Sequence, residues 1–464
     1  MKRFAIRRRP RRAIIAATTA ATLAAALAGC SGDSQDPNTV TIAYQKFGSF
    51  VAADTLFKKV KKDFEAANPD ATVELRAIEA PAEDYQTQVN LMNQSGSEAP
   101  DLIYEDSFTI NQDADAGYLR PLDEYWDKWE DAERFNEQAD AAVTGLDGKR
   151  YGALLGTDTR GLWYNKKLLE KAGVKTPWEP KDWDEILETA RTLKSKLGKD
   201  VIPLHVPSGQ PQGEEASMQG FQMLHTGTAE GDSGGLLFDE KAKKWIVGDP
   251  GFVDSLEFVK SVYGGDLSLD EQDALNANVS TINNEQRIPD GELAISMNGS
   301  WVPQAWIDSA NKPWPEWQDT MEFVPMPTKD GQDPGATSLS GGWTLAMGAK
   351  ATDPDLSWKV MAEAMNQENA TKFAIEGAQV PVRDDIADDP KFSKAPAVND
   401  VANELIDVTH FRPAYSEYPK VSIAITKAME AVMLGEASPA EAAKTYDEEV
   451  AKIVGDDKVV KAGG

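Results

Sequence analysis

The chain has 464 residues, with 48 basic and 76 acidic side chains and a formal net charge of −28 at pH 7. A charge of that sign and size repels phosphate backbones and anionic lipid surfaces, which excludes nucleic acid as a partner and leaves neutral solutes unpenalised. A single cysteine, Cys30, excludes an intramolecular disulfide.

The first 29 residues are predicted to be a secretion signal outside the fold. Met1–Arg12 is basic without an acid, and Ala13–Ala28 is an uncharged, alanine-rich stretch too short to span a bilayer. The signal ends in Leu-Ala-Gly-Cys, which resembles a bacterial lipobox and implies that Cys30 becomes a lipidated N-terminus. An arginine pair in the basic stretch leaves the twin-arginine and the general secretion routes both open. Residues 30–38, rich in Ser, Gly, Asp and Pro, are expected to be a flexible tether.

The chain beyond the tether is too long for one hydrophobic core, so two lobes are expected. Its first part alternates strands and helices: Thr39–Tyr44 (strand), Asp54–Ala67 (helix), Val73–Leu75 (strand), Glu83–Asn93 (helix) and Pro100–Tyr104 (strand). This alternation predicts a mostly parallel sheet with ligands at the carboxyl ends of its strands. The loops Gln45–Gly48 and Glu105–Ser107 are therefore expected near a ligand.

The stretch Gly152–Asn165 interrupts two apolar runs with polar residues. Ala153–Leu155 and Leu162–Tyr164 predict two short buried strands, joined by a bend at Thr157–Arg160. Asp158 and Arg160 at that bend could hydrogen-bond a polar ligand, with Trp163 and Tyr164 as flat apolar faces beside them. The alternative is a solvated turn between strands.

The remaining elements follow from periodicity and capping residues. Asp182 with Glu185, and Ser438 with Glu441, are predicted to form capping boxes at two helix starts. The elements expected in chain order are a helix from Asp182 to Gly198, strand Val201–His205, helix Asp254–Tyr263, strands Gly291–Met297, Met321–Val324 and Thr344–Gly348, helices Pro354–Gln367 and Val421–Leu434, and a last helix beginning at Pro439.

Several short motifs, in this order and spacing, resemble the extracellular solute-binding lipoproteins of bacterial ABC importers, including the maltose- and trehalose-type sugar binders. The motifs are Pro100–Ile103, Gly117–Leu122, Thr157–Arg160, Leu162–Lys166, Gly291–Ala294, Asn298–Trp301, Gly341-Gly342, Arg412-Pro413 and Tyr418–Ser422. The resemblance implies an α/β, two-lobed, type II periplasmic-binding-protein-like fold, with two mostly parallel sheets and helices on both faces.

The same resemblance implies three chain crossings between the lobes, near Thr157–Gly161, near Ser340–Leu345 and in Asp384–Ala395. Residues 39–157 and 345–392 would form the first lobe, and residues 158–344 and 393–464 the second. The protein would be a monomer anchored by lipid to the outer face of the cytoplasmic membrane. It would capture a neutral di- or oligosaccharide and deliver it to an ABC permease, contacting the ATPase only indirectly. It would be no enzyme and would need no cofactor or metal.

A sugar has apolar C–H faces and a rim of hydroxyls, so its site should combine aromatic platforms with paired donors and acceptors. By resemblance, Asp106 and Asp158 would accept hydrogen bonds and Arg160 and Arg412 would donate them, while Trp301 and Trp343 would be platforms. The lesser candidates are Gln45, Lys46, Asn298 and Tyr418. The alternatives are that either Trp is a core residue and that Arg412 is the partner of a buried acid. Gly156 departs from the family, where some disaccharide binders carry an amide, and Glu285 matches an acidic ligand residue only approximately.

Two motifs suggest chemistry that the surrounding sequence does not support. Gly231–Gly235 spells the serine-protease motif GDSGG, but it lacks the upstream barrels that would place a His–Asp pair, so we interpret it as a loop. Asn111–Asp115 resembles the start of a calcium loop without its required Gly and Glu, so we interpret it as the polar face of a helix. The alternative function is a lipid-anchored glycoside hydrolase that pairs Glu105 or Asp106 with Asp158.

Overall fold

The computed structural model describes residues 36–229, 235–387, 389–393, 405 and 408–463. The predicted signal, Cys30 and most of the predicted tether lie outside these residues. Within the described part, no helix is both long enough and apolar enough to cross a membrane.

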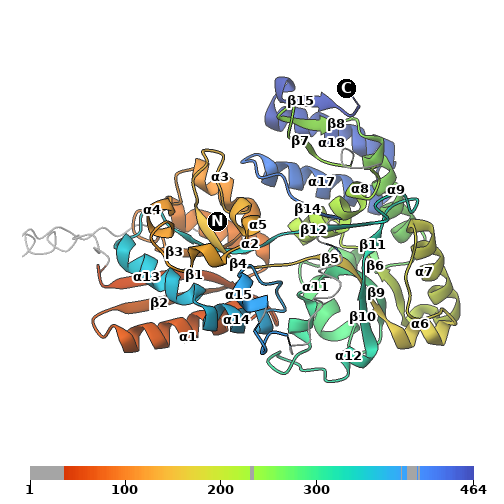
Figure 1. Cartoon of the computed structure of the whole chain (residues 1–464). Helices are drawn as coiled ribbons and strands as arrows, with labels where there is room; N and C mark the ends of the chain where they lie inside the picture. Colours follow the sequence, from red (N-terminus) through yellow and green to blue (C-terminus); the bar gives the residue numbers. More distant parts are fainter. Residues whose placement is uncertain (1–35, 230–234, 388, 394–404, 406–407, 464) are drawn as a thin grey trace, which may run out of the picture.

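The first large sheet has five strands in the order β2-β1-β3-β13-β4 (Figure 1). Its strands are β1 (Thr39–Lys46), β2 (Thr72–Glu79), β3 (Leu102–Asp106), β4 (Gly152–Thr157) and β13 (Gly342–Met347). β1 pairs in parallel with β2 and β3, whereas β13 is antiparallel to both of its neighbours. β3 and β4 end at the edge that faces the rest of the molecule, and β13 begins there. We call the region built on this sheet lobe 1.

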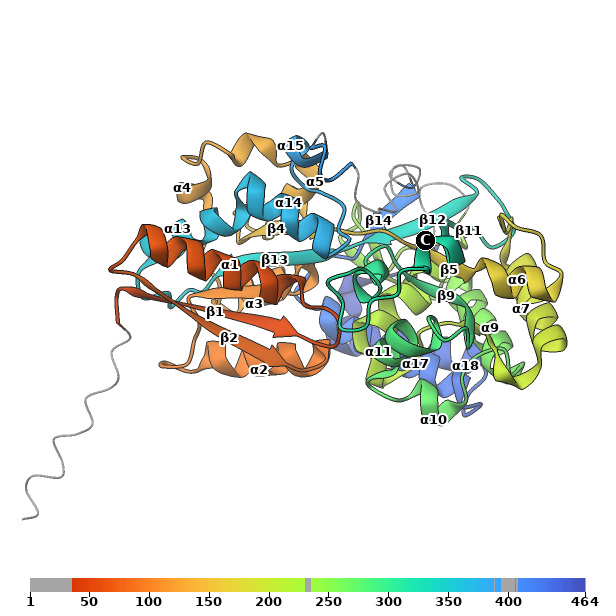
Figure 2. The ribbon, with the colours of Figure 1, turned by 90° about the horizontal axis from the view of Figure 1, so that it is seen from below.

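Helices cover both faces of the lobe 1 sheet, as expected. They are α1 (Ala52–Ala67), α2 (Ala82–Gln94), α3 (Ile110–Asp115), α4 (Asp123–Trp126), α5 (Glu137–Ala141), α13 (Pro354–Met365), α14 (Gln367–Glu376) and α15 (Asp384–Ala387). Alternation along β3 divides the core between the faces. Leu102 and Tyr104 pack with α1 and α13, while Ile103 packs with α2 and α3 on the other side (Figure 2).

The second large sheet has the order β10-β5-β9-β6, and we call the region built on it lobe 2. Its strands are β5 (Arg160–Asn165), β6 (Ile202–His205), β9 (Leu293–Gly299) and β10 (Met321–Val324). β6 and β9 are parallel, but β5 is antiparallel to both neighbours. Beyond the two sheets expected, the described residues form two three-stranded sheets. One has the order β11-β12-β14, with β11 (Met326–Pro327), β12 (Ala336–Ser340) and β14 (Thr409–Phe411). The other has the order β15-β8-β7, with β7 (Phe238–Asp239), β8 (Lys244–Val247) and β15 (Val459–Lys461).

The helices of lobe 2 bury the largest hydrophobic cluster of the protein. They are α6 (Lys166–Ala172), α7 (Trp183–Leu197), α8 (Met223–Thr226), α9 (Pro250–Gly264), α10 (Glu271–Ala274), α11 (Val279–Ile282), α12 (Trp317–Thr320), α17 (Tyr418–Met433), α18 (Pro439–Val454) and the π-helices η5 (Glu215–Gln222) and η7 (Asn283–Arg287). Ser438 and Glu441 form the predicted capping box. At α7, Asp182 accepts from the Glu185 amide, but Glu185 accepts from the amide of Lys181 rather than from that of Asp182, so only half of that box is present.

Two chain segments pass side by side between the lobes and explain the reversed strands. The first joins β4 to β5 through Asp158 and Thr159, and the second joins β12 to β13 through Gly341. Hydroxyl groups tie the two segments together, with Thr157 Oγ1 2.6 Å from Ser340 Oγ and Thr159 Oγ1 2.7 Å from Ser338 Oγ. β5 and β13 each start at this crossing and run away from it. They therefore oppose the strands that end there.

The third crossing was expected in Asp384–Ala395, and only part of that segment is described. Ile386 and Phe392 still pack with α14 in lobe 1, and the chain reaches lobe 2 at β14, which pairs with β12. Lys394 and Ala395, and most of the connection to β14, lie outside the described residues. The apolar contacts of Phe392 therefore keep the described part of this segment with lobe 1.

Candidate ligand-binding site

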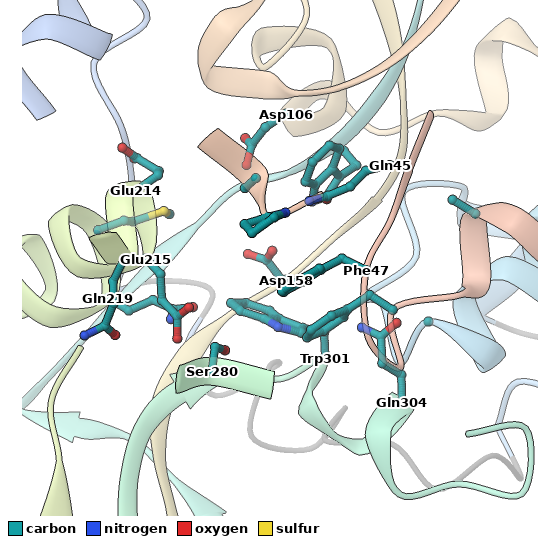
Figure 3. Close-up of a pocket in the computed structure, with 18 of the residues that line it drawn as sticks. Gln45, Phe47, Asp106, Asp158, Glu214, Glu215, Gln219, Ser280, Trp301 and Gln304 are labelled. Atoms are coloured by element: carbon teal, nitrogen blue, oxygen red, sulfur yellow. The ribbon is translucent and has the colours of Figure 1, made fainter. Parts of the chain in front are cut away.

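A cavity lies between the two lobes, where strands of both sheets end. Its volume is about 1350 Å³, including the part that is open to solvent. Figure 3 shows Phe47, Asp158 and Trp301 on one side of it and Glu214, Glu215 and Gln219 on another.

Trp301 forms part of the cavity wall just beyond the end of β9. Its half-buried ring folds back over Gly299, where a Cβ atom would lie 1.7 Å from the indole. The guanidinium carbon of Arg160 lies 4.7 Å from the ring centroid, a cation–π contact. Because Gly299 leaves room for it, the indole lies flat at the cavity with a charged group beside it.

Asp158 and Arg160 line the cavity and also connect the crossing segments. Both are buried and form an ion pair, with Asp158 Oδ1 accepting from the Gly341 amide at 2.9 Å and Arg160 Nη1 donating to the Leu339 carbonyl at 3.1 Å. Burial lowers the pKa of Arg160, while Asp158 opposes that shift. A solvated turn is therefore the wrong description of this bend. The expectation for Trp163 and Tyr164 is also wrong, because both are enclosed in the core of lobe 2, at 1% and 0% exposure.

Arg412 joins acids from both lobes. Its Nη2 donates to Asp106 Oδ1 of lobe 1 at 2.6 Å, and its Nη1 donates to Glu214 Oε1 of lobe 2 at 3.2 Å. Burial alone would lower the pKa of Arg412, but the charges of Asp106 and Glu214 raise it. Arg412 is therefore both a partner of two half-buried acids and a residue of the cavity wall.

Trp343 and Gln45 also line the cavity, from lobe 1. The ring of Trp343, on β13, stacks on Tyr104 with centroids 4.8 Å apart and an interplanar angle of 14°. Gln45 donates from Nε2 to the Ala80 carbonyl at 2.9 Å. The two alternatives for Trp343 thus coexist, because its half-buried ring packs against the lobe 1 core and also borders the cavity.

Three of the lesser candidates do not line the cavity, because the elements that carry them extend further than expected. β1 continues through Lys46, so alternation turns Lys46 away from Gln45 toward Asp54 and Glu79, at 3.8 and 3.5 Å. Asn298 lies inside β9, is 3% exposed and donates to Asn284. Tyr418 is the buried first residue of α17, and its hydroxyl donates to Glu214. It supports the wall from behind.

Sequence reasoning missed a group of polar residues on lobe 2, chiefly Glu214, Glu215 and Gln219 around η5, and Ser280 of α11. Burial raises the pKa of Glu215 to about 7, and Ser280 and Arg160 limit the shift. The sequence did contain one indication of this group, because the adjacent acids Glu214 and Glu215 directly precede the uncharged stretch Ala216–Leu224.

The two departures from the family pattern have structural explanations. A Cβ atom at Gly156 would lie 2.8 Å from the side chain of Gln379, which itself lines the cavity. Another segment therefore supplies an amide beside the position where some family members carry one. Glu285 does not line the cavity, and instead accepts a hydrogen bond from the Ser49 amide of lobe 1 at 2.6 Å.

The motifs that suggested other chemistry are enclosed or lie outside the described residues. Residues 231–234 of the protease-like motif are not described. His225 Nε2 lies 2.8 Å from Asp249 Oδ2, but His225 is only 1% exposed, so it cannot reach a substrate. Asn111 and Asp113 belong to α3 as expected but are buried rather than on a polar face, because Asp113 pairs with Glu105. The described residues contain no group of three or more metal-binding side chains.

Comparison with known proteins gives one family match and several relatives. The family model described as bacterial extracellular solute-binding protein matches residues 59–400. A maltotriose-binding protein of Pyrococcus abyssi is 24% identical over 351 residues, which is 74% of this chain and 67% of the relative. A putative binding protein of Brucella abortus is 33% identical over 144 residues, so the match spans only 31% of this chain and 33% of that protein.

Solved structures share the fold at low sequence identity. An ABC transporter solute-binding protein from Thermotoga lettingae, bound with alpha-D-tagatose, superposes with a TM-score of 0.75. It is 24% identical, and the match covers 90% of this chain and 100% of that one. The two-lobed, type II architecture expected from the sequence is thereby confirmed.

Proposed function

The chain belongs to the bacterial extracellular solute-binding protein family, whose members bind solutes and are not enzymes, and on that premise we propose that it captures a neutral saccharide. The proposed ligand is a di- or oligosaccharide, held between the lobes and delivered to the permease of an ABC importer. The observation that carries the proposal is a cavity that combines two indole rings, Trp301 and Trp343, with carboxylates, guanidinium groups and amides from both lobes. Sugars present apolar faces and hydroxyl rims that fit such a wall.

The proposed mechanism is a shift between open and closed forms. A ligand that contacts both lobes only in the closed form binds that form more tightly than the open form. This difference in affinity shifts the equilibrium toward the closed form. The ion pair between Asp106 and Arg412 supports this mechanism, because it joins a residue of each lobe at the cavity. We propose residues 39–157 with 345–392, and 158–344 with 393–464, as the moving units.

The location of the protein follows in part from its family, which is extracellular. We further propose that lipidated Cys30 anchors it to the outer face of the cytoplasmic membrane, where it works as a monomer beside its permease. Radiolabelled palmitate should enter the protein and should not enter a Cys30→Ala variant. Labelling of that variant would refute the anchor.

A thermal-shift screen of neutral saccharides on the protein without its first 30 residues tests the function. We expect at least one di- or oligosaccharide to raise the melting temperature, and calorimetry and small-angle scattering to report binding and a more compact form. Each saccharide should be recovered intact after incubation, since a binding protein cleaves no glycosidic bond. If no saccharide gives heat or changes the scattering profile, the proposal is wrong.

A further inference from the structure

The wall of the cavity that η5 forms contains polar groups that the described residues leave unsatisfied. Gln219 is 2% exposed, and its Nε2 has no hydrogen-bond partner in the described part of the chain. The same holds for Gln212 Oε1 and Arg160 Nε, and all three residues line the cavity. An unsatisfied buried donor or acceptor is unfavourable, because it has lost its hydrogen bonds to water. A ligand with hydroxyl groups, which both donate and accept, would remove that cost.

Glu215 lies among these groups and has an incomplete set of partners. The two arginines of the cavity already bind other acids, Arg412 with Asp106 and Glu214, and Arg160 with Asp158. Within the described residues, Glu215 has a hydrogen bond from Ser280 and only the more distant charge of Arg160. Figure 3 shows its carboxyl group beside Gln219, at the cavity.

We propose that Glu215 is a specificity-determining residue that accepts hydroxyl hydrogen bonds from the bound saccharide and releases its proton to solvent as the ligand binds. This inference rests on the proposed function. Hydroxyl donors stabilise the ionised carboxylate and not the protonated acid. Ligand binding therefore displaces the proton, and protons compete with the saccharide.

The electrostatic surroundings of Glu215 support the coupling. Burial raises the pKa of Glu215 to about 7, so that near neutral pH about half of the empty protein holds this proton. The charged groups that line the same cavity are Asp106, Asp158, Glu214, Arg160 and Arg412, and α17 adds Tyr418 behind Glu214. The other elements packed against η5 are η4 (Gln210–Gln212), β9 and β12, and none of them contains a charged residue. Nor does α11, which supplies Ser280. α8 adds only His225, which is paired with Asp249.

Glu214 differs from Glu215 in that its hydrogen-bond partners are in place without a ligand. Arg412, Tyr418 and Ser422 all donate to its carboxylate. Burial raises its pKa, but the charge of Arg412 opposes the shift. Glu214→Gln is thus a matched control for Glu215→Gln, because it neutralises the adjacent acid of the same wall without a change in side-chain size.

Calorimetric titration in buffers of different ionisation enthalpy measures the proton release. The probes are maltotriose, arabinotriose and N,N′-diacetylchitobiose, all neutral at pH 7. For each probe that binds we expect release of about 0.3–0.5 proton at pH 7, and an affinity that falls up to about tenfold per pH unit below that pH. Glu215→Gln should bind at least about tenfold more weakly and release no proton. Glu214→Gln should still release it.

Three results would overturn the assignment. Binding heats that do not depend on the buffer would reject proton release while leaving the proposed function intact. Release that persists in Glu215→Gln but disappears in Glu214→Gln would assign the proton to the neighbouring acid. If no probe binds at millimolar concentration, the proposed function fails for these saccharides, and the inference fails with it. Circular dichroism and the melting temperature of each variant establish that it is folded.

Discussion

Removal of two hydrogen bonds between the lobes should weaken binding of every ligand by the same factor. The turn between β1 and α1 contacts lobe 2 through Ser49, whose amide donates to Glu285 Oε1 at 2.6 Å, and through Gly48, whose carbonyl accepts from Asn311 Nδ2 at 3.0 Å. The same turn carries Phe47 and Phe50, which line the cavity. Glu285 and Asn311 do not line it, so their contacts favour closure without touching a ligand.

The magnitude follows from the two bonds. A hydrogen bond to a charged group contributes ~1.5–3 kcal/mol and a neutral one ~0.5–1.5 kcal/mol, with the exposed Asn311 contact at the low end. Loss of ~2–3 kcal/mol from the closed form raises the apparent Kd about 30–150-fold when the empty protein is mainly open. The glycine at position 48 supports this contact, because its φ of +53° disfavours other residues and a Cβ atom there would lie 2.8 Å from Glu285 Oε1.

The assay is calorimetry on Glu285→Ala/Asn311→Ala with two saccharides of different affinity, and scattering profiles of the empty and bound forms. We expect both Kd values to rise by the same factor and their ratio to stay constant. Glu285→Gln retains an acceptor and should show a smaller effect. The control is Glu79→Ala, which removes an exposed acid of lobe 1 that pairs only with Lys46 among the described residues. A loss confined to one saccharide would show that Glu285 or Asn311 contacts the ligand, and unchanged Kd values would refute the role in closure.

Three further predictions concern the cavity and the core. Trp301→Ala should weaken saccharide binding by more than about 30-fold in calorimetry, as at other Trp contact sites. The melting temperature of the empty protein should stay nearly unchanged, because the ring is half-buried at the cavity. A large drop in melting temperature would instead assign Trp301 to the core. Asp158→Ala should destabilise the protein by ~3–5 kcal/mol in urea unfolding, because it leaves Arg160 buried without its partner. A variant as stable as the parent would show that the ion pair does not stabilise the fold. Glu105→Gln should flatten the decline of the unfolding free energy as the pH rises above ~4. Burial and Asp113 raise the pKa of Glu105, so the folded state keeps a proton that the unfolded chain loses near pH ~4, and stability falls as the pH rises. Parallel pH profiles for variant and parent would contradict this reasoning.

Local patterns predicted the regular elements of the fold within a few residues. The amphipathic spacing of α1 and the caps of α7 and α18 are encoded in neighbouring residues, so their bounds follow from the sequence. The directions of β5 and β13 do not, because each depends on where the chain crosses between lobes. The π-helix η5 was not predicted, and tertiary contacts hold it, with Gly220 against the Pro207 carbonyl.

The same distinction applies to the cavity. Asp158, Arg160 and Arg412 were found because charged residues beside apolar runs, matched to a family motif, point to a buried polar site. Lys46 was misplaced because β1 continues past its expected end, and in a strand each added residue turns to the opposite face. Glu215 was missed because only the tertiary position of η5 brings its carboxyl group to the cavity.

The residues that could bind the ligand fall into two mechanical classes. Asp158 and Arg160 belong to the crossing segments, where they hold Gly341 and Leu339 in place, so they keep the same neighbours as long as those segments stay paired. Trp301 and Glu215 belong to lobe 2, whereas Phe47 and Gln45, which line the same cavity, belong to lobe 1. In the proposed closure, only contacts across that space change between open and closed forms, and only such contacts can make ligand binding favour closure. In that proposal the wall residues would determine which ligand closes the protein, whereas the crossing residues would set the axis about which it closes.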